Sequence, residues 1–382
     1  MVTLSSADNA LKSFYLDAIT ETLNMKINPF LAMVEKTSEN VTGKDVRKVL
    51  TSGFNSGVGA GSETGNLPSA QNRNHYQIVA PLKNFYGTLE ISDKAIRASA
   101  NNEGAFVNLL NDEMKTLVNS AKFNFGRMLF GDGSGVIGTV SECDEQTVTV
   151  DNIWNFAADM VVDIVGEDDE VEAIQIRSID FENKILYMTE ERGNLSSMTG
   201  AKIYMHGSRG NDLTGLQAIF SKQNLYGLDR EVPGMVPYEK TMDGYLTEDV
   251  IVEMMDKIEE ASGKKVNLMI CSWKVKRAIL KYYRDYGVPC QTMTLENGET
   301  AIDFYGTPIV TDKFCPEDAL YFLNTDCFKL YQLCDWQWLE TEDGKILKQI
   351  AGKPVYTATL VKYAELICEH PGAQGVLRGI HI

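Results

Sequence analysis

The sequence predicts an α+β fold that is interrupted by a small all-β module. Three observations support this class: a long amphipathic helix at residues 105–129, a run of short β-rich segments at residues 136–212, and alternating helices and strands from residue 244 onward. The 382-residue chain is long enough for two or three domains, and its hydrophobic fraction of 44% is sufficient for a sizeable core.

Composition argues against several classes of protein. The formal net charge of −17 disfavours a chain that binds nucleic acid through a wholly basic face. The first residues, MVTLSSADNALKS, lack the basic start and apolar run of a signal peptide, and no segment approaches an apolar membrane span. The seven cysteines are scattered without a C-x-x-C pair, so we expect reduced thiols of an intracellular protein rather than a disulfide framework or a zinc site.

A glycine-rich stretch, GVGAGSETGNLP, occupies residues 57–68. A dinucleotide-binding loop requires G-x-G-x-x-G, but Ser62 and Thr64 stand where the third glycine should be, and no lysine follows Gly65 as a P-loop requires. The flanking segments, residues 44–55 and 75–92, are rich in β-forming residues. We therefore expect a large hairpin with a glycine-rich tip. Because a lone hairpin is marginally stable in water, it needs another surface, such as a neighbouring subunit, to lie on.

The strongest helix signal spans residues 105–129. Asn101 or Asn102 is placed to cap its start, and the glycine cluster at 131–135 is placed to end it. A glycine cluster that follows a helix has the wrong order for a phosphate loop. Apolar residues recur at helical spacing, and we expect them to form a stripe that faces the core, with the principal members Phe106, Leu110, Met114, Leu117 and Phe125.

The order of these features resembles that of tailed-bacteriophage major capsid proteins, which have the Hong Kong 97-type capsid fold. The resemblance rests on an N-terminal segment, the hairpin with GAGSETGNLP, the stretch YGTLEISDKAIRAS at 86–99, and the long helix that ends in GDGSG. Residues 359–380, TLVKYAELICEHPGAQGVLRGI, resemble the closing strand and the final edge strand of that fold. The resemblance covers most of the chain, and the ordered set carries it rather than any single motif.

The resemblance implies a division of the chain into seven parts. These are an N-terminal arm at 1–42, an extended hairpin loop at 43–92, a peripheral domain with a spine helix at 93–135, a β-barrel-like insertion domain at 136–212, a return to the peripheral domain at 213–243, an axial domain at 244–354, and a closing peripheral strand with an axial edge strand at 355–382. An amphipathic helix at 11–24 belongs either to the arm or to an ordinary globular core. The resemblance also implies that the loop tip contacts other subunits through Gly57, Gly59, Gly61, Glu63, Gly65 and Pro68.

The β-rich segment at 136–212 concentrates the negative charge. Its short strands and turn signals suit a small barrel or sandwich. Residues 136–215 contain 16 Asp and Glu residues and 5 Lys and Arg residues, a net charge of −11. Four of these acidic residues are consecutive at 167–170. Consecutive carboxylates on one turn rarely converge on an ion, so a solvated loop is favoured over a metal site.

Residues 244–354 alternate helices and strands. A helix at 244–263 is expected to begin at Thr247 and end at Gly263, and Ser272 is expected to cap a second helix at 273–287. This second helix has five basic residues, which raises the alternative of a nucleic-acid patch. Since apolar residues alternate with them, a solvated amphipathic face is favoured; the basic residues are Lys274, Lys276, Arg277, Lys281 and Arg284.

Motifs for chemistry are missing from the sequence. None of the four histidines lies in H-E-x-x-H or a similar frame, and there is no G-x-S-x-G elbow. We therefore expect no catalytic, cofactor-binding or metal-binding residue, and no cofactor. Some members of the resembled family crosslink lysine to asparagine with the help of a glutamate. Lys83 and Asn84 raise that possibility, but we expect noncovalent closure.

The function expected from the resemblance is that of a structural major capsid protein. Its copies would associate as pentamers and hexamers into an icosahedral shell in the virion, enclosing double-stranded DNA without sequence-specific binding and without a membrane. Assembly would take place in the host cytoplasm, with scaffolding, portal and decoration proteins as candidate partners. Two alternatives stay open: an encapsulin-type compartment shell, and a multidomain ligand- or carbohydrate-binding protein with its β-module at 136–212.

Overall fold

The computed structural model describes residues 16, 29–52, 57–66, 74–95, 103–221, 223–287, 289–295 and 298–381. Several sequence predictions lie outside these residues: the helix at 11–24 apart from residue 16, the helix caps Asn101 and Asn102, and Pro68 at the hairpin tip. The described elements build two mixed sheets, a three-stranded sheet, a short two-stranded sheet and a closed barrel.

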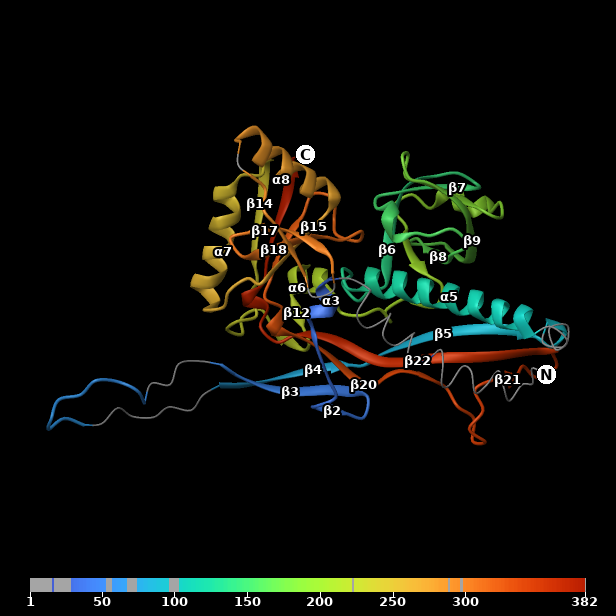
Figure 1. Cartoon of the computed structure of the whole chain (residues 1–382), viewed down its shortest axis with the longest axis horizontal. Coiled ribbons are helices and arrows are strands. Elements are labelled where there is room, and N and C mark those ends of the chain that lie inside the picture. The colour runs from blue at the N-terminus through green and yellow to red at the C-terminus, as the bar shows by residue number, and fades with distance from the viewer. Residues whose placement is uncertain are drawn as a thin grey trace.

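The longest sheet is built on two strands that are distant in the sequence. β5 and β22 pair antiparallel over ten residue pairs, and Figure 1 shows them running side by side along the length of the molecule. β20 and β21 pair with the other side of β22, and β1 lies parallel to β20. The strand bounds are β1 (Glu35–Thr37), β5 (Lys83–Ser92), β20 (Phe328–Trp338), β21 (Lys348–Gln349) and β22 (Val355–Cys368).

The helix α5 (Glu103–Met128) lies on one face of this sheet, within two residues of the predicted range. Residues of β5 alternate between buried and exposed, as expected for a strand with one covered face. Gly87 admits the helix closely, since a Cβ there would lie 3.0 Å from Leu117 Cδ1. The rings of Phe85 and Phe125 pack edge to face with centroids 5.2 Å apart.

Three members of the predicted core stripe of the long helix have described side chains. Met114 and Phe125 are buried, and Leu117 is partly buried against the same core. The side chains of Phe106 and Leu110 lie outside the described residues.

The second sheet has seven strands, and each of its faces packs into a different core. Met269 and Cys271 belong to a cluster covered by α7 (Glu248–Ser262) and α8 (Trp273–Asp285), whereas Leu268 and Ile270 belong to the main core. The strand order is β14 (Tyr238–Tyr245), β23 (Gly375–His381), β19 (Leu320–Leu323), β15 (Leu268–Cys271), β18 (Thr307–Thr311), β17 (Thr300–Phe304) and β16 (Thr292–Thr294).

Two sequence predictions about this region need correction. The final strand, β23, is not an edge strand, because β14 pairs parallel with it on one side and β19 pairs antiparallel on the other. The chain also leaves the seven-stranded sheet well before residue 354: after the turn η4 (Thr325–Cys327) it enters β20 of the longest sheet. Local sequence patterns show that strands exist but carry no information on which partner each one takes.

The predicted ends of the two helices are largely correct. Gly263 ends α7 in a left-handed conformation with φ of 69°, and the Ser272 side chain accepts a hydrogen bond from Val275 N at 3.1 Å. Thr247 occupies the N-cap position of α7, but its side chain makes no capping hydrogen bond.

The predicted hairpin is formed by β3 (Asp45–Ser52) and β4 (Asn74–Pro81), which pair antiparallel over their full length. The segment predicted as one extended arm, residues 75–92, is divided at Leu82: β4 stays in the hairpin, whereas β5 joins the longest sheet. The Leu82 amide donates to Lys44 O at 2.8 Å and closes the base of the hairpin. Short elements pack around this base: β2 (Val41–Thr42), α3 (Pro29–Met33), α6 (Leu216–Ser221), β12 (Asn224–Leu225) and β13 (Leu228–Asp229).

Six strands close into a barrel with its own core, which stands beside the seven-stranded sheet and above α5 in Figure 1. Its buried residues form a cluster separate from the other two cores. Two 3₁₀ turns, η2 (Ile153–Asn155) and η3 (Gly193–Ser197), pack against this barrel, and η5 (Pro371–Ala373) lies outside it. Its strands are β6 (Val136–Cys143), β7 (Thr147–Val150), β8 (Val161–Val165), β9 (Glu170–Asp180), β10 (Ile185–Met188) and β11 (Lys202–Met205).

We predict that Leu117→Asp lowers the free energy of unfolding by about 3 kcal/mol, because it places a charge against Gly87 and the covered face of β5. This is a large part of the stability of a typical domain. Asn119→Asp, on the exposed face of the same helix, is the matched control. Denaturant unfolding of both variants tests the prediction, and equal midpoints would show that the stripe is misplaced.

We also predict that residues 134–210 fold when expressed alone, because the barrel closes its own sheet and buries its own apolar cluster. The expected result is one cooperative thermal transition with dispersed amide signals in an NMR spectrum. A chain without tertiary structure would show that the barrel depends on its contacts with the remainder of the protein.

Candidate functional site

The β3–β4 hairpin has one face anchored in the protein and one face directed to solvent. Val46, Ile78 and Ala80 are buried in the main core. On the opposite face, Val49 is 58% exposed and Val79 is 38% exposed. Exposed valines on a projecting hairpin are an apolar surface that another chain can cover.

The hairpin tip holds the predicted contact residues. Gly59, Gly61, Glu63 and Gly65 are exposed and Gly57 is partly exposed, and the adjacent Val58 is 70% exposed. Figure 1 shows that the tip projects far from the body of the molecule. The described tip residues therefore lie away from the core of their own chain.

The barrel is joined to the remainder of the protein by two chain crossings that lie against each other. The Gly210 amide donates to Ser134 O at 2.7 Å, and Leu216 N donates to Leu129 O at 2.8 Å. Gly215 is required here, since a Cβ would lie 2.6 Å from Leu129 O. The entry and exit of the barrel are thus fixed side by side.

A buried ion pair lies beside these crossings. Arg127 Nη1 at the end of α5 donates to Asp212 Oδ2 at 2.8 Å, and both side chains are 3% exposed. Among the described residues, Arg127 Nε and Nη2 and Asp212 Oδ1 have no hydrogen-bond partner. Because breaking such a pair leaves a buried charge, the contact fixes the relative position of α5 and the barrel exit.

Two residues of the longest sheet also hold the barrel exit. Lys83 Nζ donates to Gly210 O at 2.7 Å, and Thr214 N donates to Glu365 Oε1 at 2.8 Å. Glu365 is 1% exposed, and its burial raises the pKa of its carboxyl to about 7. Lys83, which the sequence raised as a crosslinking residue, is thus held by the barrel exit of its own chain, while Asn84 is exposed next to it.

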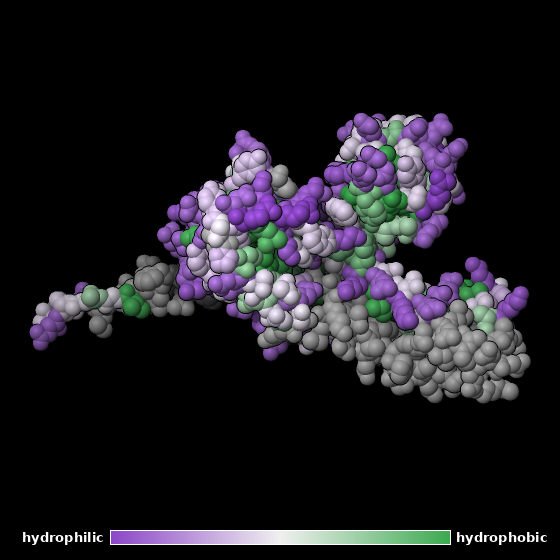
Figure 2. Space-filling view, turned by 45° about the horizontal axis from the view of Figure 1, so that its top comes forward, coloured by the Kyte–Doolittle hydropathy of each residue, from purple (hydrophilic) through white to green (hydrophobic). Residues whose placement is uncertain are grey.

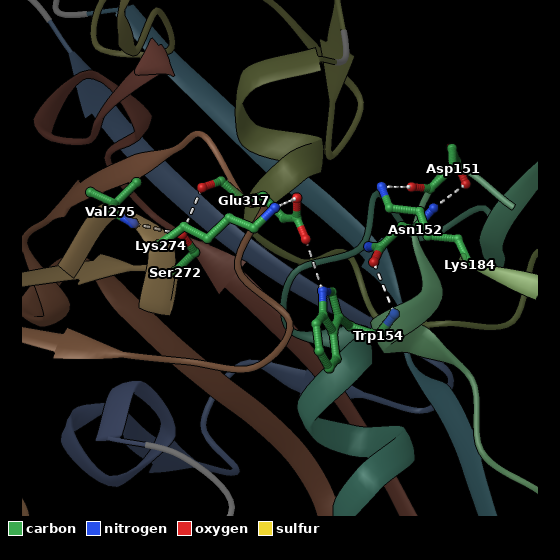
Figure 3. A network of polar contacts seen from close by, with 8 residues as sticks. All are labelled: Asp151, Asn152, Trp154, Lys184, Ser272, Lys274, Val275 and Glu317. Carbon is green, nitrogen blue, oxygen red and sulfur yellow. Dashed lines mark hydrogen bonds and ion pairs between the residues drawn. The ribbon is translucent and has the colours of Figure 1, made fainter. Parts of the chain in front are cut away.

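The barrel has a second polar attachment, to the loop that precedes β19. Glu317 accepts hydrogen bonds from Trp154 Nε1 at 3.1 Å and from the Lys274 ammonium, as Figure 3 shows. Burial alone would raise the pKa of Glu317, but these two hydrogen bonds and the positive charges of Lys274 and Lys184 together hold the pKa below its ordinary value. One carboxylate therefore links the barrel to the first turn of α8.

Sequence reasoning did not identify these attachment residues. Asp212 and Glu317 are single acidic residues in loops, and their partners lie 85 and 163 residues away in the sequence. The only available signal was the glycine cluster at 131–135, which we interpreted as a helix stop. Its glycines also permit a close approach, because a Cβ on Gly135 would lie 2.6 Å from Ser208 O.

Potential metal ligands do not cluster in the described part of the chain. The acidic run at 167–170 is exposed; its first three residues form the turn between β8 and β9, and Glu170 begins β9. Within the same residues, no helix is long and apolar enough to cross a membrane. The seven cysteines all lie in described segments, and none forms a disulfide.

Solved capsid structures share this architecture. The capsid of cyanophage A-1(L) is 11% identical over 92% of this chain and 92% of that chain, with a TM-score of 0.56. The capsid of an empty GTA particle is 10% identical over 94% and 90%, with a TM-score of 0.51. The holo-SrpI encapsulin complex from Synechococcus elongatus PCC 7942 is 12% identical over 93% and 89%, with a TM-score of 0.47. The first two likenesses show that the chain has the Hong Kong 97-type capsid fold.

The family follows from the sequence itself. The model of the SU10 major capsid protein family matches residues 8–346, so the chain belongs to this family of major capsid proteins. No curated protein matches the chain. Its role is structural rather than catalytic: it assembles with its own copies into the capsid of a virion, as the sequence led us to expect. The family assignment removes the alternative of a ligand- or carbohydrate-binding protein.

We predict that Glu365→Gln stabilises the protein at pH 8 relative to wild type, with little effect near pH 4.5. A carboxyl whose pKa is raised in the folded state contributes stability below its unfolded pKa, and that stability is lost as the pH rises through about 7. The expected difference at pH 8 is a few kcal/mol at most. Denaturant unfolding from pH 4.5 to 8 tests this, with Glu90→Gln on the exposed face of β5 as control. A difference that does not change with pH would contradict the assignment.

Proposed function

We propose that copies of this chain associate as pentamers and hexamers into an icosahedral shell that encloses double-stranded DNA, and that each β3–β4 hairpin lies on an adjacent copy. The hairpin carries this proposal. Its base is anchored in the main core, its outward face presents Val49 and Val79, and its tip is exposed on all its described residues except Gly57. An arm of this kind gains stability only when a second molecule covers it.

Charge supports DNA as the enclosed molecule and an outward position for the barrel. The net charge of −17 keeps a polyanion from adhering to the wall. Residues 136–215 hold −11 of this charge, and Figure 2 shows hydrophilic residues over the outer part of the barrel, with a hydrophobic area on the side toward the rest of the molecule. Such a surface is costly to bury in a lattice contact, so we propose that the barrel is an insertion domain that projects from the outer face.

The remaining division of the chain and its partners belong to the same proposal. The arm at 1–42, the peripheral parts at 93–135 and 213–243, and an axial module around the seven-stranded sheet follow the order of the family fold. Assembly in the host cytoplasm, and association with scaffolding, portal and decoration proteins, are proposed on the same basis.

Electron microscopy of the purified protein tests the shell directly. We expect closed particles with five-fold and six-fold capsomers, and protection of long double-stranded DNA from nuclease in particles recovered from infected cells. Particles that hold protein cargo and no DNA would instead favour the compartment alternative. Barrels in the lumen or against DNA would overturn the outward placement but not the shell.

We predict that deletion of residues 57–65 leaves a folded, soluble chain that does not close shells. These residues are largely exposed and make few contacts in their own chain, so their removal should change the melting temperature of isolated subunits little. Particle formation is measured by sedimentation and microscopy. As a matched control, a glycine–serine segment of the same length replaces residues 57–65. It keeps the length of the hairpin and changes only its sequence. A large drop in melting temperature, or normal closure, would contradict the contact.

A further inference from the structure

The helices α7 and α8 cover the same face of the seven-stranded sheet. α7 contacts β14 and β23, at one edge of the sheet. α8 follows β15, and its Val275 and Ile279 share one buried cluster with residues of both β17 and α7.

The exposed residues of the two helices form stripes of identical spacing. On both helices, exposed positions recur at i, i+4, i+7 and i+11, which is one face of an α-helix. On α7 the stripe is acidic: Asp249, Glu253, Asp256 and Glu260. On α8 it is basic and apolar: Trp273, Arg277, Leu280 and Arg284, with Lys281 beside them.

The two helices carry net charges of opposite sign. α7 has six acidic residues and one lysine, a net charge of −5, whereas α8 has five basic residues and one aspartate, a net charge of +4. Some of these charges are paired locally, for example Glu253 with Lys240. Arg277, Asp249 and Asp256 make no ion pair within the described part of the chain.

The α8 stripe also presents apolar surface. Trp273 is 48% exposed and Leu280 is 38% exposed, although both lie on a helix that buries its other face. Tryptophan and arginine on one exposed face are typical of the energetically dominant residues of protein interfaces. A site for nucleic acid would use the basic residues alone and would leave the matching acidic stripe without a role.

We propose that the acidic stripe of α7 on one copy packs against the stripe of α8 on the next copy, head to tail around each capsomer ring. This inference rests on the proposed function. A heterologous contact of this kind closes a ring when the rotation between copies allows it. The charges set partner and register, while Trp273 and Leu280 supply apolar burial, because exposed ion pairs alone contribute little.

Charge reversal tests the contact. Variant A carries Arg277→Glu and Lys281→Glu, variant B carries Asp256→Lys and Glu260→Lys, and variant C carries all four changes. Arg177→Glu with Lys202→Glu, on the exposed barrel surface, is the matched control. We expect A and B each to lose about tenfold or more in yield of closed particles, because like charges would face each other. C and the control should assemble like wild type.

Coexpression of A and B adds a second readout. A–A and B–B contacts are repulsive, whereas alternation restores opposite charges at every contact. Only rings with an even number of copies can alternate, so we expect hexamers without pentamers and therefore no closed shells. Thermal melting of isolated subunits shows whether each variant is folded. If A or B does not fold, a variant with Arg277→Gln and Lys281→Gln is used instead. We expect the yield of particles from this neutral variant not to depend on salt concentration, unlike that of wild type.

Each outcome decides between the two proposals. If wild type forms no shells, the proposed function fails. If wild type forms shells and A and B do so equally well, or if C is folded and stays defective, the contact is wrong while the shell stands. If only A is defective and it alone loses affinity for double-stranded DNA, the α8 stripe binds nucleic acid and the ring contact is rejected.

Discussion

The antiparallel pairing of β5 with β22 is the interaction on which the other parts of the structure depend. It joins a segment from the first quarter of the chain to one near its end, over ten residue pairs. α5 packs on β5, β20 adds to β22, and the hairpin ends at Leu82, where β5 begins. Closing so large a loop has a high entropic cost and is slow. The packing of α5 and β20 against the paired strands must offset this cost. The hairpin is therefore directly continuous with β5, the strand that pairs with β22 and packs against α5.

Local features of this fold could be predicted from the sequence, whereas pairing between distant segments could not. The long helix, the Ser272 cap and the Gly263 end follow from side-chain periodicity and from hydrogen bonds within one turn. The resemblance to capsid proteins supplied the expected order of the parts, and the family assignment confirms the resemblance itself. The position of β23 between β14 and β19, and the departure of β20 into another sheet, depend on contacts across the chain. For the same reason the Arg127–Asp212 pair and the Glu317 link were missed: each is made by ordinary residues that only the fold brings together.

Charge is distributed unevenly over the molecule: most of the net negative charge lies on the barrel, whereas the buried charged groups lie at the barrel exit. The barrel carries most of the negative charge on a sheet that closes on itself, so the repulsion is solvated rather than buried. The buried ion pair and the buried Glu365 lie instead at the barrel exit, where chain crossings exclude solvent. Polar groups in the interior of this protein therefore serve to position one part against another, which is consistent with a chain that has to keep its shape while it contacts many copies of itself.

The close approach at the barrel entrance has a consequence for how such proteins diversify and how they can be engineered. Since Ser134 O and Gly210 N are 2.7 Å apart, the intervening residues begin and end at almost one point. A different module with adjacent termini can replace the barrel there without altering the path of α5 or of the longest sheet. Recombination can therefore exchange the inserted module while the rest of the fold stays constant, and a foreign domain grafted between these two residues would be carried once by every copy.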